Sequence, residues 1–173
     1  MEGQLATTAI MLLPLTFCVH DAEEALMLQK WLRTGAKTAK QRYAVAARVI
    51  KQLSKLTTKA FIIAALEELA ILIIATAYYI AEGPYSDYIW IALALAFTLH
   101  IVVHLFQAII LRGYVPGVIT GVALLPYSLY LWRHILNSYS ATEITLLGIS
   151  GIAFMAINLV MAHGLGKALA REE

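Results

Sequence analysis

Long apolar segments, separated by short polar connections, dominate the pattern of the chain. Five of them come close to the ~20 residues that an α-helix needs to cross the ~30 Å hydrocarbon core of a bilayer. The later connections are short turns, so sequential helices should be antiparallel neighbours. The pattern predicts transmembrane helices at residues 5–28, 60–81, 88–111, 115–132 and 144–169.

Residues 36–57 follow a different pattern. Apolar residues such as Ala39, Tyr43 and Ile50 recur at three- and four-residue steps, and basic residues fill the opposite face. This predicts an amphipathic helix on an anionic membrane surface, or alternatively a connector helix that faces water. The predicted fold class is an all-α integral membrane helical bundle of about five transmembrane helices plus one amphipathic basic helix. We expect residues 1–173 to form a single transmembrane domain.

The composition agrees with a membrane protein. Hydrophobic residues make up 61% of the chain and charged residues only 14%, whereas soluble domains have about 25% charged residues. So few charges cannot cover a surface in water. The single cysteine excludes an internal disulfide bond. No positive charge precedes the first apolar segment, so we expect a retained helix rather than a cleaved signal peptide.

The basic residues are unevenly distributed. Nine of the 13 Lys and Arg residues lie between Lys30 and Lys59. The positive-inside rule predicts that this stretch is cytoplasmic, with the N-terminus outside, the C-terminus inside and the cytoplasmic membrane as the location. We expect no nucleic-acid partner, because predicted spans flank the basic stretch. Trp90 and Trp132 should mark the outer interface and Trp31 the inner one.

Several ionisable residues lie within the predicted spans. An acidic residue at the centre of a membrane helix costs about 2.5–3.5 kcal/mol even on lenient insertion scales, so such residues are usually functional. The residues that we expect to bind metal are His20, Glu23, Glu24, Glu67, Glu68, His100, His104 and His163.

Helical spacing groups the acidic ligands. His20, Glu23 and Glu24 stand at positions i, i+3 and i+4, so they share one face. Glu67 and Glu68 point about 100° apart, so one can bind the ion while the other bonds a neighbour. The sequence does not tell which of the two faces the site.

The predicted helix 88–111 has a similar face, formed by His100, His104 and Gln107. Two histidines four residues apart can chelate one ion, as in the H-E-x-x-H zinc helix. We expect Gln107 to orient the ligands by hydrogen bonding rather than to bind the metal itself.

Depth in the membrane points to one common site. At 1.5 Å per residue, His20 lies roughly 15 Å from Lys30. The polar residues of the other three helices lie roughly 12 Å from Lys59, Arg112 and Arg171. Four helices thus place polar groups in one layer of the cytoplasmic half, where we expect a single buried pocket.

A divalent cation would keep such buried carboxylates ionised. The nitrogen and oxygen ligands are numerous enough for one or two ions, and they suit zinc or iron. Glu24 or Glu67 is the expected catalytic general base. The alternative without metal is a proton relay or a polar packing network.

The stretch His20-Asp-Ala-Glu-Glu24 resembles the signature of the HXXEE family of membrane proteins. The likeness continues with Glu67-Glu68, His100-x-x-x-His104-x-x-Gln107, Arg112, Tyr114-Val-Pro116-Gly117 and Thr120, in the order of the family's pattern. The resemblance implies a small helical membrane protein, but it supplies no established reaction.

Three kinds of function fit these features. The first is a metalloenzyme, a zinc-type hydrolase or a di-iron-type oxidoreductase, whose lipid-like or amphipathic substrate enters from the membrane lipids. The second is a metal or proton transporter, although the outer half lacks polar residues for a path. The third is a scaffold whose His/Glu network only fixes helix packing. The sequence leaves the oligomeric state open, a homo-oligomer included.

Overall fold

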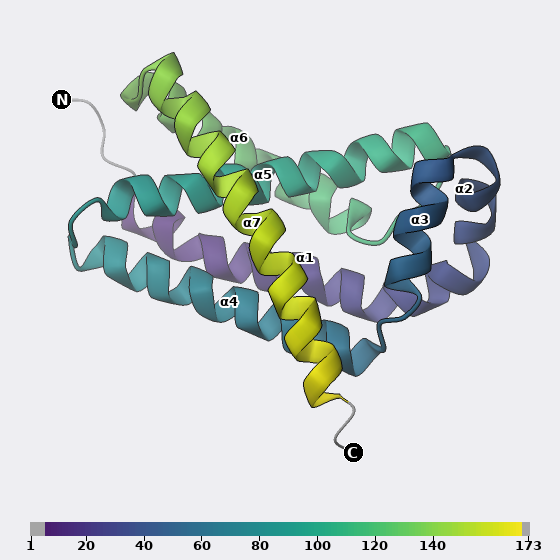
Figure 1. Cartoon of the computed structure of the whole chain (residues 1–173). Coiled ribbons are helices and arrows are strands. Elements are labelled where there is room, and N and C mark those ends of the chain that lie inside the picture. Colours follow the sequence, from purple (N-terminus) through teal and green to yellow (C-terminus); the bar gives the residue numbers. More distant parts are fainter. Residues whose placement is uncertain (1–5, 171–173) are drawn as a thin grey trace.

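Residues 6–170 are described by the computed structural model, and every regular element in that range is an α-helix (Figure 1). The all-helical fold class is therefore confirmed. The predicted helix start at Leu5 and the cytoplasmic Arg171 lie outside the described residues. The seven helices are α1 (Thr7–Thr34), α2 (Ala36–Arg42), α3 (Ala44–Leu53), α4 (Thr58–Ile80), α5 (Ser86–Leu111), α6 (Val118–Ser138) and α7 (Ala141–Leu169).

The long helices pack around α1 and α5. Helix α1 contacts α4 and α6, and α5 contacts α4, α6 and α7. Helix α7 crosses obliquely over α4 and α5 (Figure 1). Sequential helices α4 and α5 are neighbours, as are α5 and α6, which agrees with the short turns between them.

The apolar core lies where α1, α5 and α6 meet. Leu13, Trp90, Ile101 and Leu131 are at most 1% exposed there. The expectation that Trp90 marks a membrane interface is therefore wrong. Its indole N–H donates to Oγ1 of Thr76 on α4 at 3.3 Å, so the ring is buried without an unpaired donor.

Three helices, α4, α5 and α7, are long and apolar enough to cross a membrane. The prediction of about five such helices is wrong in number, because α1 and α6 fall short within the described residues. The polar residues from His20 to Glu24 reduce the apolar character of α1. Helix α6 is shorter, and it contains Gly121, Pro126 and Arg133.

The surface of these helices is largely apolar. Ile74 on α4, Ile109 on α5 and Val160 on α7 are 67%, 70% and 73% exposed. Only Gly151, Ala162 and Gly166 of α7 are buried, although most of the helix is apolar. Soluble monomers rarely expose such large apolar surfaces. This surface and the three long helices indicate a membrane protein.

The predicted helix at residues 36–57 is two short helices, α2 and α3, because the backbone is extended at Tyr43. The break lets α2 fold back on α3. Ala39 of α2 and Ile50 of α3 are buried in one small cluster with Trp31 and Val115. Part of the apolar face of this segment is thus covered by the protein itself, whereas Tyr43 is 40% exposed. Trp31, expected at the inner interface, is buried there and donates its indole N–H to the carbonyl of the adjoining Tyr114 at 2.8 Å.

Two glycines let α7 approach the helices beneath it. A Cβ atom on Gly151 would collide with the carbonyl of Ala92 in α5, and one on Gly166 would collide with the carbonyl of Ala60 in α4. Small residues permit this close backbone contact in membrane helices. Helix α7 therefore rests on α5 at one point and on α4 at another, and it bridges the space between them.

Candidate metal centre

Three histidine side chains converge on one carboxylate oxygen between α1 and α5. Oε1 of Glu24 lies 3.2 Å from Nε2 of His20, one turn earlier on α1. The same oxygen lies 3.1 Å from Nε2 of His100 and 2.9 Å from Nε2 of His104. These two Nε2 atoms are themselves 3.1 Å apart. We call the four residues the His–Glu cluster.

Helical spacing on each side produces this convergence. His20 and Glu24 are four residues apart on α1, and His100 and His104 are four apart on α5, so each pair shares one helix face. The ring centroid of His20 lies 5.1 Å from that of His100 and 5.2 Å from that of His104. Phe97 packs edge-on against His20 at 5.8 Å and closes the cluster on one side.

The cluster is shielded from solvent. His20 is 0% exposed and His104 is 8% exposed. The side chain of Glu24 is 13% exposed and that of His100 is 32% exposed. An ionised carboxylate at such a place costs several kcal/mol unless a positive charge balances it. A protonated histidine or a metal ion would supply that charge, and without either the carboxyl group of Glu24 would be neutral.

The hydrogen bonds behind His20 decide which of its nitrogens carries a proton. Nδ1 of His20 lies 3.0 Å from Oγ1 of Thr120. The hydroxyl of Thr120 donates its one proton to Oε2 of Glu23 at 2.6 Å, so Nδ1 of His20 must be the donor to that hydroxyl. A neutral His20 then turns the lone pair of Nε2 toward Glu24, and this buried nitrogen has no hydrogen-bond partner. Two acceptors face each other there, and a cation would resolve the conflict.

The geometry of the cluster fits a metal ion. One ligand atom from each of the four residues lies within 4.8 Å of all the others. Zinc binds histidine nitrogen and carboxylate oxygen at about 2.0–2.2 Å, which places neighbouring ligands of a tetrahedron about 3.3 Å apart. The distances from Glu24 to the three histidines, 2.9–3.2 Å, differ little from that spacing. The cluster could therefore hold a metal ion.

Glu23 lies outside the cluster, and its carboxylate joins α1 to the start of α6. Oε2 accepts hydrogen bonds from the backbone N–H and the hydroxyl of Thr120 at 2.7 and 2.6 Å. Oε1 accepts from the hydroxyl of Tyr114 at 2.8 Å and from the N–H of Ile119 at 3.3 Å. A carboxylate at a helix N-terminus is also favoured by the helix dipole. Burial and the hydrogen bond to Glu23 raise the pKa of the Tyr114 hydroxyl above its usual value.

The turn before α6 comes so close to the cluster that only glycine fits. Gly117 has φ +85°, in the left-handed region. A Cβ atom there would lie 2.9 Å from Cε1 of His20 and 3.1 Å from Oε1 of Glu24. The backbone of Gly117 thus forms one wall of the cluster.

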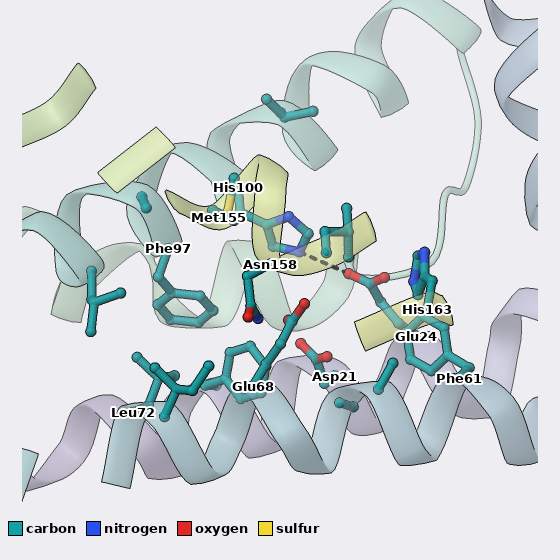
Figure 2. A pocket seen from close by; sticks show the side chains of 18 of the residues that line it. Asp21, Glu24, Phe61, Glu68, Leu72, Phe97, His100, Met155, Asn158 and His163 are labelled. Atoms are coloured by element: carbon teal, nitrogen blue, oxygen red, sulfur yellow. Dashed lines mark hydrogen bonds and ion pairs between the residues drawn. The ribbon is translucent and has the colours of Figure 1, made fainter. Parts of the chain in front are cut away.

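A cavity of about 290 Å³ adjoins the cluster, bounded by α1, α4, α5 and α7. Glu24, His100 and His104 line the cavity, and the fully buried His20 stands behind them. Figure 2 shows the bond between His100 and Glu24 at the edge of this space, with Asp21 and Glu68 extending into it. The candidate metal centre is therefore open on one side.

Comparison with known proteins gives one match. A family model described as a protein of unknown function with HXXEE motif matches residues 11–131. The chain belongs to the HXXEE family. No curated protein and no solved structure matches it.

The HXXEE motif of this chain is His20, Glu23 and Glu24, and these residues have two different roles in the structure. His20 and Glu24 belong to the cluster, whereas Glu23 accepts hydrogen bonds from the start of α6. All four cluster residues lie within the range of the HXXEE match, and helix α7 lies beyond it. The part of the chain shared with the family thus contains the whole candidate metal centre.

The remaining predicted ligands of this HXXEE protein lie around the cavity or near it. Glu68 lines the cavity, and its Oε1 is buried without a hydrogen-bond partner. Oε2 of Glu67 accepts a hydrogen bond from the amide of Asn158 at 3.1 Å. His163 lines the cavity beside Phe61, at a ring distance of 6.5 Å.

Four of the eight expected ligands, His20, Glu24, His100 and His104, thus come together, and four helices line one pocket as the depth pattern predicts. Gln107 lines the cavity from an exposed position on α5. The roles of the individual residues in metal binding stay predictions.

Sequence reasoning on this HXXEE chain missed one residue of the site and the role of another. Asp21 lines the cavity and is close enough to Glu68 for their carboxylates to repel each other. Its signal was available, because it is an acidic residue within an apolar segment. It stands one position after His20 but three before Glu24, so it shares a helix face with Glu24 and not with His20. Thr120 belongs to the pattern that resembles the HXXEE family, but its role in orienting His20 had no signal, since only the tertiary structure brings the two together.

Proposed function

We propose that this protein is a membrane-embedded metalloenzyme that binds a divalent metal ion through His20, Glu24, His100 and His104 and acts on a lipid-like substrate. One observation carries the proposal: three histidine nitrogens meet a single carboxylate oxygen, with an unpartnered buried nitrogen on His20.

Hydrogen bonding alone does not account for the cluster. If His20 is neutral, its Nε2 faces Glu24 with a lone pair, and the buried acceptor has no donor. Leaving a buried polar atom unsatisfied costs about 1–3 kcal/mol. A shared metal ion would give His20, His100 and His104 a common partner and would balance the charge of Glu24.

An enzyme is favoured over a purely structural metal site because the cluster has an open side. Four protein ligands alone would make a closed structural zinc site, so catalysis would need a further coordination position on the side that faces the cavity. Here Glu24, His100 and His104 border a cavity large enough to admit part of a small molecule. A bound metal ion would supply a Lewis acid and an acidified water at this edge.

The carboxylates in the cavity are available for proton transfer. Glu68 and Asp21 line the cavity and lie near the cluster, so either can take a proton from a group bound there. Glu24 is occupied as a ligand in this proposal, and Glu67 is held by Asn158. The proposal therefore assigns the acid–base role to Glu68 and Asp21 rather than to Glu24 or Glu67.

The proposed setting is the cytoplasmic membrane, with α4, α5 and α7 crossing it and α1 and α6 packed beside them. Gly166 on α7 packs on Ala60 of α4, so Lys167 and Lys59 fall at the same end of the bundle. The basic helices α2 and α3 adjoin that end, which supports a cytoplasmic orientation for it. The N-terminal end of α1 would then lie on the outer side.

Metal analysis of the purified protein tests the proposal. We expect about one bound zinc, iron or manganese ion per chain after anaerobic dialysis against each metal, and loss of that ion in His100→Ala and Glu24→Gln. The matched control is His134→Ala, because His134 lies on α6 beside Ser138, away from the cluster. A folded wild-type protein that binds none of the three ions would refute the metal site.

The metal identity then separates the two reaction classes. Iron with an oxygen-dependent absorption spectrum would favour an oxidoreductase, and zinc would favour a hydrolase. Both outcomes are compatible with the cluster, since imidazole and carboxylate ligands suit either metal.

A further inference from the structure

The cavity beside the cluster has an apolar wall with one acidic patch. Aromatic and aliphatic side chains such as Phe61, Leu72 and Phe97 form most of the wall. Figure 2 shows the carboxylates of Asp21 and Glu68 directed toward each other in the middle of this space. A ligand would therefore need an apolar body and a small polar end.

The cavity reaches the protein surface between α5 and α7. Val103 on α5 lines the cavity and is 42% exposed, and Phe154 and Leu159 on α7 line it and are 45% and 41% exposed. Helix α7 contacts its neighbours closely at Gly151 and Gly166, so the residues between these contacts cover the cavity without closing it on all sides. The apolar rim favours a ligand that arrives through hydrocarbon rather than through water.

The charge of the cavity limits the head group of such a ligand. Asp21, Glu24 and Glu68 are in the wall, and none of the described residues that line it is Lys or Arg. Lys167 is one turn beyond His163 on α7 and is not in the wall. The metal ion of the proposed function would attract an anion at the cluster itself, but beside Asp21 and Glu68 an anion would be repelled strongly in this apolar surrounding. A donor, in contrast, would satisfy the buried and unpartnered Oε1 of Glu68.

We infer that the cavity binds a single-chain amphiphile whose head group donates hydrogen bonds and bears no negative charge, namely a long-chain amine or alcohol. The head group lies at Asp21 and Glu68, and the chain leaves between α5 and α7. Fatty acids and phosphate-bearing lipids are disfavoured by the same carboxylates. As a statement about the substrate this rests on the proposed function, but the binding itself does not require the metal.

A competition experiment in lipid nanodiscs tests this inference. The protein is photolabelled with a diazirine-bearing long-chain alcohol, and dodecylamine, dodecanol and dodecanoate compete with it. We expect the label on α5 and α7 between residues 103 and 163, as mapped by mass spectrometry. The amine and the alcohol should compete at concentrations at least about tenfold lower than the carboxylate. Equal competition by dodecanoate would overturn the inference.

Two variants show whether the acidic patch sets the preference. Glu68→Gln should reduce the amine-to-carboxylate preference at least about threefold, while the exposed Glu82→Gln should leave it unchanged. Asp21→Asn replaces Glu68→Gln if the latter does not fold. An unchanged preference in a folded cavity variant contradicts the inference.

The metal content of the same samples separates this inference from the proposed function. Metal binding without any head-group preference would contradict only the inference about the ligand. A preference for the amine or alcohol head group in a protein that binds no metal would support the inference about the ligand and contradict only the proposed metalloenzyme.

Discussion

Nδ1 of His20 on α1 lies 3.0 Å from the hydroxyl oxygen of Thr120 on α6, one hundred residues further along the chain. The same hydroxyl donates to Glu23 at 2.6 Å. Two residues of the HXXEE motif are therefore linked through α6. Glu23 accepts a hydrogen bond from Thr120, and Thr120 in turn accepts one from His20, which faces Glu24. Hydrogen bonds to the nitrogen that faces away from the ion fix the tautomer and the ring orientation of metal-binding histidines.

The first prediction concerns this link. Thr120→Val removes the hydroxyl and should weaken metal binding about 10- to 100-fold, whereas Thr120→Ser should restore most of it. Competition with a chelator of known affinity measures the change. The control is Thr145→Val, because the Thr145 hydroxyl bonds only its own helix at the carbonyl of Ala141. Equal affinities in Thr120→Val and wild type would show that the hydroxyl does not orient His20.

The second prediction concerns the turn before α6. Gly117→Ala forces a side chain into the left-handed region and places its Cβ 2.9 Å from His20. We expect it to lower the free energy of unfolding by about 1–3 kcal/mol and to weaken metal binding as well. Gly113→Ala is the control, since its Cβ would meet nothing closer than a backbone oxygen at 3.9 Å. Thermal unfolding and metal titration of both variants in one detergent measure the effects, and equal behaviour would contradict the close fit.

The third prediction separates ligands from neighbours in the cavity. His104→Ala should abolish metal binding, whereas His163→Ala should keep about one ion per chain, because His163 lines the cavity but is not in the cluster. Metal at 100 times its Kd stabilises the folded state by about 2.7 kcal/mol. A chelator should therefore lower the melting temperature of wild type and His163→Ala, but not that of His104→Ala. Metal loss in His163→Ala would enlarge the ligand set.

The fourth prediction concerns the contact of α7 with α4. Gly166→Leu places a side chain against the backbone of Ala60, whereas a Cβ atom at Gly164 on the same helix would meet nothing within 4 Å, so Gly164→Leu is the control. We expect the first variant to lose about 1–3 kcal/mol of stability or more, and the second to be nearly neutral. Thermal unfolding in detergent measures both. Comparable stability of the two variants would mean that α7 does not pack closely on α4.

Several properties of this protein follow from the sequence alone. Apolar stretches of sufficient length predict α4, α5 and α7, because burying backbone polar groups in hydrocarbon requires internal hydrogen bonds. Four-residue spacing places His20 with Glu24 and His100 with His104, since such pairs share a helix face. These are local properties, and each depends only on residues close together in the chain.

Tertiary packing decided the rest. Trp90 and Trp31 have the same side chain as Trp132, but they are buried and Trp132 is half exposed, because partners from other helices cover them. Glu67 and Glu68 are adjacent, and the position of α7 determines that Asn158 bonds Glu67 while Glu68 lines the cavity. The joining of His20 to Thr120 depends on contact between helices distant in sequence. Local spacing cannot predict such contacts, because it contains no information on how the helices are placed relative to one another.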